Sequence, residues 1–277
     1  METSIFNANI KFTKSEKKVY DYVINNYEEV IYKTITELSH ETGVGETTVL
    51  RFCRKLGFTG YQEFKLALTQ EIYKFTSSDT DNFENLGEFS EVVSNTINNS
   101  MNVIKETARI LDEQTLSAVV KLILESNRIL LVGSSMSGNS ALDAQNRLMR
   151  IGINAEYYSD THLELMSSNT LNENDLLIAF SVSGSTKNTI QAIEFAKQNK
   201  AKIIVITNKI QSKAASLADI VLITKGRESP LEGGSLPAKI SQLCIINIIY
   251  NLLVYADKKK ADENRRKTSE AIAVKSY

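Results

Sequence analysis

Two glycine- and serine-rich stretches of the chain have the composition of an anion-binding site. They are residues 132–138 (VGSSMSG) and residues 180–186 (FSVSGST). Each stretch follows an apolar run and precedes a helical pattern, so hydroxyls and unpaired backbone N–H groups would gather at the start of a helix. Such a turn binds anions, above all phosphate. Neither stretch has the GxxxxGK[ST] pattern of nucleoside triphosphate sites or the GxGxxG pattern of dinucleotide sites.

The elements around these two turns predict how they are positioned. From Asp112 onwards, short apolar runs alternate with helical stretches, which indicates a doubly wound α/β domain with a five-stranded parallel sheet. The predicted strands are residues 128–132, 153–158, 176–181, 203–207 and 220–224. In the flavodoxin-like order 2-1-3-4-5, the turns after the first and third strands lie side by side, where open sheets bind ligands. One phosphate-bearing molecule would then touch both turns. The alternative is that serine and glycine only cap the two helices.

A helix-turn-helix pattern lies nearer the N-terminus, in residues 35–64. Apolar residues at helical spacing flank the break at residues 42–45 (TGVG), which indicates two short helices joined by a tight turn. The second helix, predicted at 46–56, turns Val49, Phe52 and Leu56 inward. Its other face would contact DNA through hydroxyls near the helix start and cationic side chains further along, which are Thr47, Thr48, Arg51, Arg54 and Lys55.

The net charge of the N-terminal segment does not by itself favour DNA binding. Residues 1–75 contain as many acidic as basic side chains, so attraction to DNA must come from local asymmetry. A dimer would neutralise about twice as many phosphates as a single copy, and affinity depends steeply on that number. The alternative is an ordinary helical hairpin with a solvated basic face.

The chain is predicted to contain two domains and two further segments. Residues 1–75 form an all-α helix-turn-helix domain, and residues 112–258 form the α/β domain. Between them, residues 76–111 form a polar linker and a connector helix, at about 89–111, that could serve as a dimer surface. Residues 259–277 form a basic tail, expected to be a solvated helix or a frayed end. Both prolines fall in residues 225–237, which we expect to be a long irregular loop.

Composition narrows the class of protein. The 277 residues are 42% hydrophobic and 23% charged, which is ordinary for a soluble protein. We expect no membrane-spanning run and no signal peptide, and hence a cytoplasmic protein. Cys53 and Cys244 have no partners at metal-ligand spacing, which favours buried free thiols over a disulfide or a zinc site. We expect neither a metal nor a cofactor.

Both sets of residues resemble known families. Residues 181–186 (SVSGST) resemble the SxSGxT signature of the sugar isomerase (SIS) phosphosugar-binding domain, and residues 133–137 resemble its GxGxS turn. Residues 44–64 resemble the helix-turn-helix of RpiR-type transcription regulators. That family's pattern is matched by Val49, Arg51-Phe52, Leu56-Gly57-Phe58 and Phe64-Lys65. The combined resemblance covers nearly the whole chain, with the domains in the family's order.

The resemblance implies a cytoplasmic, dimeric or tetrameric regulator that binds a DNA operator, controls carbohydrate metabolism and responds to a sugar phosphate. It implies an effector site with phosphate contacts from the hydroxyls of Ser137, Ser181, Ser183 and Thr186, and backbone contributions from Gly133, Ser135, Gly184 and Ser185. Two positions depart from the family's pattern. Gly45 stands where a serine usually caps the recognition helix, and Ser135 replaces the second glycine of GxGxS.

Two other functions stay open at this point. An aldose–ketose isomerase would need a general base near the sugar. The candidates are His162, Glu164, Glu228 and Glu232, none of which lies in a motif for that role. An adaptor that senses a sugar phosphate without binding DNA would lack the steep salt dependence of a DNA complex. The resemblance favours the regulator, for which no catalytic residue is expected.

Overall fold

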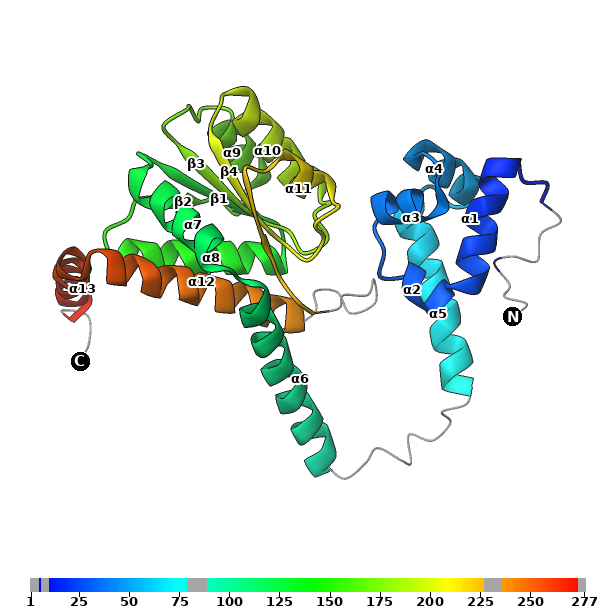
Figure 1. Cartoon of the computed structure of the whole chain (residues 1–277), viewed down its shortest axis with the longest axis horizontal. Helices are drawn as coiled ribbons and strands as arrows, with labels where there is room; N and C mark the ends of the chain where they lie inside the picture. The colour runs from blue at the N-terminus through cyan, green and yellow to red at the C-terminus, as the bar shows by residue number, and fades with distance from the viewer. Residues whose placement is uncertain (1–4, 6–9, 79–88, 227–235, 274–277) are drawn as a thin grey trace. The chain divides into compact units, whose positions relative to one another are not determined.

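The chain folds as two units joined through α6 (Figure 1). The computed structural model describes residue 5 and residues 10–78, 89–226 and 236–273. The first unit holds α1 to α5, and the second begins at Ser100 within α6 and extends to α13. This order, helical first and α/β second, is the predicted one. Most of the expected linker and most of the expected loop at 225–237 lie outside the described residues.

Local capping signals explain where two helices of the first unit, α1 and α3, begin. These are α1 (Lys14–Asn25), α2 (Tyr27–Val30), α3 (Ile35–Thr42), α4 (Glu46–Lys55) and α5 (Tyr61–Ser78). Thr13 and Glu16 form a capping box at the start of α1, and Thr34 and Glu37 form another at the start of α3. α3 ends at Gly43, whose φ of 64° is the left-handed conformation that glycine adopts most readily. This glycine produces the predicted turn between α3 and α4.

The core of the first unit forms around α4. Val49 and Phe52 are fully buried, as predicted, whereas Leu56 is only half-buried. The ring of Phe52 meets that of Phe64 edge-on, with 5.7 Å between the centroids. Cys53 is a fully buried free thiol, and burial raises its pKa to about 12. Cys244, which we also expected to be buried, is a free thiol that is only partly so.

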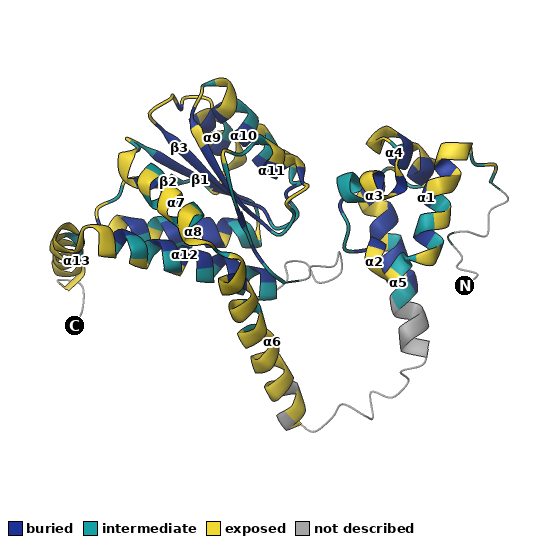
Figure 2. Cartoon of the chain, viewed as in Figure 1, coloured by how far each residue is buried: buried dark blue, intermediate teal, exposed yellow. Residues whose placement is uncertain are grey.

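The second unit is a three-layer α/β domain. Its sheet is parallel, with strands β1 (Ile129–Gly133), β2 (Ala155–Tyr157), β3 (Leu176–Phe180), β4 (Lys202–Thr207) and β5 (Ile220–Ile223). The strand order β2-β1-β3-β4-β5 confirms the prediction. One face packs against α7 (Glu113–Glu125), α8 (Met136–Arg150) and α12 (Leu236–Ala256), and the other against α9 (Thr161–Ser168), α10 (Lys187–Gln198) and α11 (Lys213–Leu217). The last helix, α13 (Lys258–Ala273), contacts α8 and α12. Figure 2 shows the buried strands between these layers.

α12 corrects the expectation that no apolar run reaches membrane-spanning length. This 21-residue helix is long and apolar enough to cross a membrane by length and composition. In the structure, Ile245, Ile249 and Leu253 are buried in the core on one face of the sheet. Packing against the sheet therefore accounts for the apolar face of α12 that these residues form.

The C-terminal segment, expected to be a solvated helix or a frayed end, is a mostly exposed helix over its described residues. Its described residues form α13, which packs on the α/β domain rather than fraying into solvent. Ala261 is buried in the domain core. Asn264 donates a hydrogen bond to the carbonyl of Ile151 at 3.2 Å, and Arg265 donates to the Tyr250 hydroxyl at 2.8 Å. The domain that contains the candidate effector site therefore extends beyond residue 258.

Candidate effector site and DNA-binding helix

The two anion-binding turns leave neighbouring strands at the same edge of the sheet. β1 and β3 are paired in parallel, and Gly133 at the end of β1 is in register with Phe180 at the end of β3. All residues of both strands are buried. The buried strands therefore place the starts of α8 and α10 side by side, as the strand order predicted.

The first turn is tightly packed and strained. A Cβ atom at Gly133 would approach the carbonyl oxygens of Ser137 and Phe180 at 3.0 and 3.1 Å, and one at Gly138 would collide with the hydroxyl of Tyr157. Ser135, the N-cap of α8, has φ 55° and ψ −124°, a backbone conformation that residues other than glycine rarely adopt. This backbone conformation is a physical reason for glycine at the equivalent position of the GxGxS pattern.

The second turn arranges its hydroxyls around a left-handed glycine. Gly184 has φ 60°, and a Cβ atom there would collide with Ser212. The Oγ atom of Ser181, which is 2% exposed, accepts the N–H of Gly184 at 3.1 Å and lies 3.4 Å from the Thr186 hydroxyl. Ser183 Oγ accepts the N–H of Ser185 at 3.3 Å. The three hydroxyls are thus held within one turn.

Neither turn caps its own helix with a side chain. Ser135 is the N-cap of α8 and Thr186 is the N-cap of α10, and neither hydroxyl accepts a hydrogen bond from its helix. Five other described helices do have such a bond, from Thr13, Thr34, Asp112, Asp160 and Ser212. The alternative that these residues only cap helices therefore does not describe α8 and α10. The first N–H groups of both helices lack a capping side chain, which leaves them available to an external anion.

Two buried side chains contact the first turn from behind: Gln242, to which the sequence assigned no role, and Glu164, which it offered only as a candidate general base. Gln242 on α12 is 1% exposed, and its Nε2 donates to Ser137 Oγ at 3.2 Å. Glu164 on α9 is 4% exposed, and its Oε2 accepts the N–H of Gly133 at 3.3 Å. Burial raises the pKa of the Glu164 carboxyl. Both contacts join distant segments, so no local pattern predicts them.

The exposed face of α4 differs from the predicted one. Thr47, Arg51 and Arg54 are exposed, as expected. Thr48 is only 8% exposed, and its hydroxyl accepts a hydrogen bond from Arg51 at 3.3 Å. Within the described residues, no hydrogen bond or ion pair holds the side chain of Arg54. Arg54 is therefore the least constrained cation of this helix.

Lys55 is held by its own domain rather than free to face a partner. Its Nζ lies 2.6 Å from Glu16 Oε2 and 3.3 Å from the carbonyl oxygen of Lys11. The Glu16 side chain is 5% exposed and also belongs to the capping box of α1. Burial opposes ionisation of Glu16, but hydrogen bonds from Lys55 and Thr13 outweigh it and lower the pKa of the carboxyl. Lys55 thus ties the end of α4 to the start of α1.

Comparisons with known proteins match both domains of the chain. Residues 1–74 match the helix-turn-helix domain of the rpiR family, and residues 122–252 match the SIS domain. An uncharacterised HTH-type transcriptional regulator of Clostridium perfringens, CPE0189, is 32% identical over 96% of both chains. The chain belongs to the RpiR family of transcriptional regulators. The structure of Vibrio vulnificus NanR complexed with ManNAc-6P is similar, with a TM-score of 0.85, 28% identity, and coverage of 96% of this chain and 95% of NanR.

The α/β fold of this RpiR-family regulator also occurs in enzymes. Phosphoheptose isomerase GmhA from Neisseria gonorrhoeae shares the fold with a TM-score of 0.51 and 19% identity, covering 59% of this chain and 97% of the enzyme. Of the four candidate bases, His162 is exposed, and Glu164 is buried behind the first turn. Glu228 and Glu232 lie outside the described residues.

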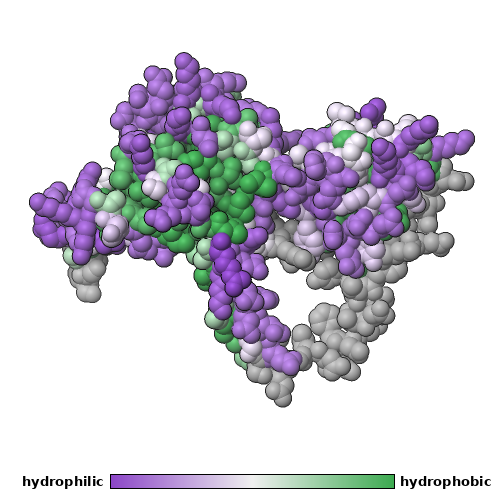
Figure 3. All heavy atoms as spheres, in the orientation of Figure 1, coloured by the Kyte–Doolittle hydropathy of each residue, from purple (hydrophilic) through white to green (hydrophobic). Residues whose placement is uncertain are grey.

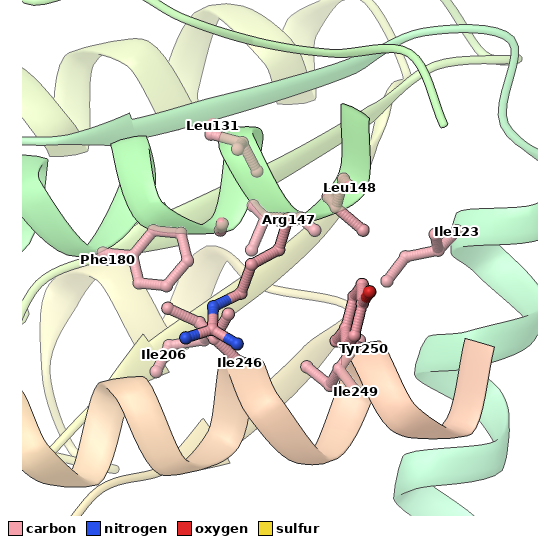
Figure 4. Close-up of a pocket in the computed structure, with 11 residues that line it drawn as sticks. Ile123, Leu131, Arg147, Leu148, Phe180, Ile206, Ile246, Ile249 and Tyr250 are labelled. Atoms are coloured by element: carbon pink, nitrogen blue, oxygen red, sulfur yellow. The ribbon is translucent and has the colours of Figure 1, made fainter. Parts of the chain in front are cut away.

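A pocket elsewhere in the regulator is unsuited to a phosphate. It lies between the sheet, α8 and α12 and is lined mainly by apolar side chains, among them Leu131, Phe180 and Ile246 (Figure 4). Its charged lining residue, Arg147, is paired with Asp143 at 2.7 Å. A phosphate would find no unpaired cation among these lining residues, in contrast to the hydroxyls and N–H groups of the two turns.

Proposed function

We propose that this RpiR-family regulator binds a DNA operator through α4 and that a sugar phosphate, held by the turns of α8 and α10, changes its affinity for DNA. The regulator acts in the cytoplasm on genes of carbohydrate metabolism, as a homodimer or homotetramer. The proposed effector site comprises the residues of the two turns, and the proposed DNA contacts are led by Arg51 and Arg54.

One observation carries the effector site: two adjacent helix starts have N-cap hydroxyls that make no bond to their own helices. Hydroxyls and N–H groups at a helix start match the acceptor oxygens and the negative charge of a phosphate. The similarity to NanR, whose structure contains ManNAc-6P, supports a phosphorylated sugar as the class of ligand.

A dimer is supported by the connector helix, α6 (Phe89–Ile110). Four apolar side chains, Val93, Ile97, Met101 and Ile104, recur at helical spacing and are 42%, 53%, 48% and 44% exposed. Figure 3 shows apolar side chains along this helix. Burying the stripe against a second copy would remove it from water. Two copies of α4 would then read half-sites about one helical turn, or a multiple of it, apart.

The proposal is tested by measuring affinity for the DNA upstream of the regulator's own gene, with and without a panel of sugar phosphates. We expect one sugar phosphate to shift the affinity, while the unphosphorylated sugar has no effect at the same concentration. The log–log slope of affinity against salt should be steep, on the order of −5 for about six neutralised phosphates. A flat salt response would exclude DNA binding by α4 and favour an adaptor.

The isomerase alternative is tested with the same preparation. Among the described residues, Glu164 is the one candidate carboxyl for a general base. However, its Oε2 accepts a backbone N–H and its side chain is buried. We expect no interconversion of aldose and ketose phosphates when the panel is incubated with the protein and followed by NMR. Turnover that disappears in Glu164→Gln would overturn the assignment as a sensor.

A further inference from the structure

α12 carries two consecutive buried polar side chains, Ser241 and Gln242, that contact different parts of the α/β domain. Ser241 is fully buried and Gln242 is 1% exposed. Gln242 hydrogen-bonds Ser137 in the first turn, and Ser241 lies 2.6 Å from the hydroxyl of Thr107 on α6. The two residues therefore join the candidate anion site to the connector helix within a single domain.

The contact with Gln242 leaves Ser137 prepared for an anion. Gln242 Nε2 donates, so Ser137 Oγ accepts and keeps its own proton for another acceptor. A phosphate oxygen would take that proton as a charge-assisted hydrogen bond. Anion binding therefore acts directly on the atom that Gln242 holds.

The contact with α6 has a defined direction. Thr107 Oγ1 donates to the carbonyl of Val103 at 2.7 Å, because a carbonyl oxygen can only accept. Thr107 is thus the acceptor from Ser241, whose own Oγ accepts the backbone N–H of Lys225 at 2.9 Å. These hydrogen bonds join three parts of the domain: α6, α12 and the residues that follow β5.

Thr107 is also where α6 is anchored. Among the α6 side chains whose burial the structure describes, it is the only buried one, and Figure 2 shows the rest of the helix largely exposed. A change at this single anchor would therefore alter how α6 is held. In the sequence, α6 stands between the rest of the α/β domain and the helix-turn-helix domain, so a change in how α6 is held acts on the covalent connection between them.

We propose that Gln242 and Ser241 couple anion binding at the α8 turn to the position of α6. The proposal rests on the proposed effector site. An anion bound to Ser137 shifts the hydrogen bond to Gln242; α12 responds as a rigid helix, and Ser241 transmits the change to Thr107. Gln242 is thus a positioning residue for the anion, and Ser241 and Thr107 form the joint to α6.

The test is hydrogen–deuterium exchange of the full chain with inorganic phosphate as the probe, against chloride at equal ionic strength. In the wild type, phosphate should slow exchange at residues 133–138 and 181–187. It should also change exchange around Thr107 of α6 at least about fivefold, the lower range of ordinary coupling. Ser241→Ala and Thr107→Val should keep the protection of both turns but lose the response of α6. Thr107→Ser, which retains the hydroxyl, is the matched control and should respond like the wild type.

Gln242 has its own pair of variants. Gln242→Leu should weaken phosphate binding, and Gln242→Glu should weaken it further, because a carboxylate would take the Ser137 proton and repel the anion. A purely structural role would not produce this ranking. Exchange in β1 and β3 without phosphate reports whether each variant is folded. If Ser241→Ala does not fold, the comparison of Thr107→Val with Thr107→Ser tests the coupling instead.

The outcomes separate the two proposals. If α6 fails to respond in the wild type, or responds equally in Thr107→Val, the coupling is refuted while the effector site stands. If phosphate protects neither turn in the wild type, the effector site itself is refuted, and the coupling falls with it.

Discussion

In the helix-turn-helix domain, α1 and α3 begin with capping boxes, whereas in the α/β domain α8 and α10 begin with hydroxyls that make no bond to their helices. Both domains use serine or threonine at these N-cap positions, so residue type alone does not show which helices are capped by a side chain. The first group satisfies its own helix starts and stabilises the fold. The second leaves donors at neighbouring helix starts unsatisfied by side chains, which suits a site that is completed by a ligand.

The same contrast divides the cations of α4. Lys55 is held by the buried carboxylate of Glu16, whereas the side chain of Arg54 has no hydrogen bond or ion pair within the described residues. Mutation of a group already paired within the fold should change stability. Mutation of an unpaired one should change binding while stability stays constant. The following predictions test that division.

The largest effect is expected in the second turn. Ser183→Ala combined with Thr186→Ala should lower affinity for the sugar phosphate at least about a hundredfold, since each charge-assisted hydrogen bond contributes roughly 1.5 to 3 kcal/mol. DNA affinity without effector and the thermal midpoint should not change. Calorimetry measures the first quantity and DNA titration the second. Ser185→Ala is the control, because only its backbone is assigned to the site; equal affinity in the double variant and the wild type would refute the site.

Arg54→Ala and Arg51→Ala should each weaken DNA binding by about 1 to 3 kcal/mol where the arginine reads a base. Both side chains are exposed, so the free energy of unfolding should barely change. Fluorescence anisotropy on labelled operator measures the affinity. Lys121→Ala removes an exposed cation from α7 in the other domain and should leave affinity unaltered. Wild-type affinity in both arginine variants would remove α4 as the recognition helix.

Lys55→Met should lower the stability of the helix-turn-helix domain by about 2 kcal/mol, because it leaves Glu16 buried without its cation. The pKa of Glu16 is lowered from its ordinary value of 4.5, so the pair's contribution is fully present above that pH and is lost as the pH falls through the folded-state pKa. Urea unfolding at several pH values measures both effects.

Adding Glu16→Gln to Lys55→Met separates stability from DNA contact. Glutamine can still complete the capping box, so most of the lost stability should return. If Lys55 also contacts DNA directly, affinity will stay low in the double variant after stability is restored. An undiminished stability in Lys55→Met alone would show that the ion pair contributes little.

The smallest effect is expected at the first turn. Ser135→Gly should raise stability by about 1 kcal/mol, because glycine relieves the positive-φ strain and its greater freedom in the unfolded chain offsets part of that gain. Thermal unfolding measures it. Ser134→Gly provides the comparison, since Ser134 is not among the residues with positive φ and gains nothing from glycine. A loss of stability in Ser135→Gly would show that contacts of the Ser135 side chain offset the strain of its positive-φ backbone.

The sequence by itself determined the elements and the location of both candidate sites. Helical periodicity and the glycine-containing break at residues 42–45 predicted the helix-turn-helix, because these signals act within a few residues of one another. Apolar runs between helices predicted the parallel sheet, and the two turns followed from glycine and serine after buried strands. Resemblance to the SIS domain named the hydroxyls of the second turn, and the structure places those side chains within one turn.

Only the tertiary structure decided which polar groups are already used within the fold. Thr48 is buried, Lys55 is paired with a residue on another helix, and Gln242 reaches Ser137 from a position 105 residues away. Periodicity assigns a side chain to a face of its helix, but it does not say which distant group packs there. Long-range contacts depend on how the elements are arranged in space, and that arrangement determines which residues remain free to bind DNA or an effector.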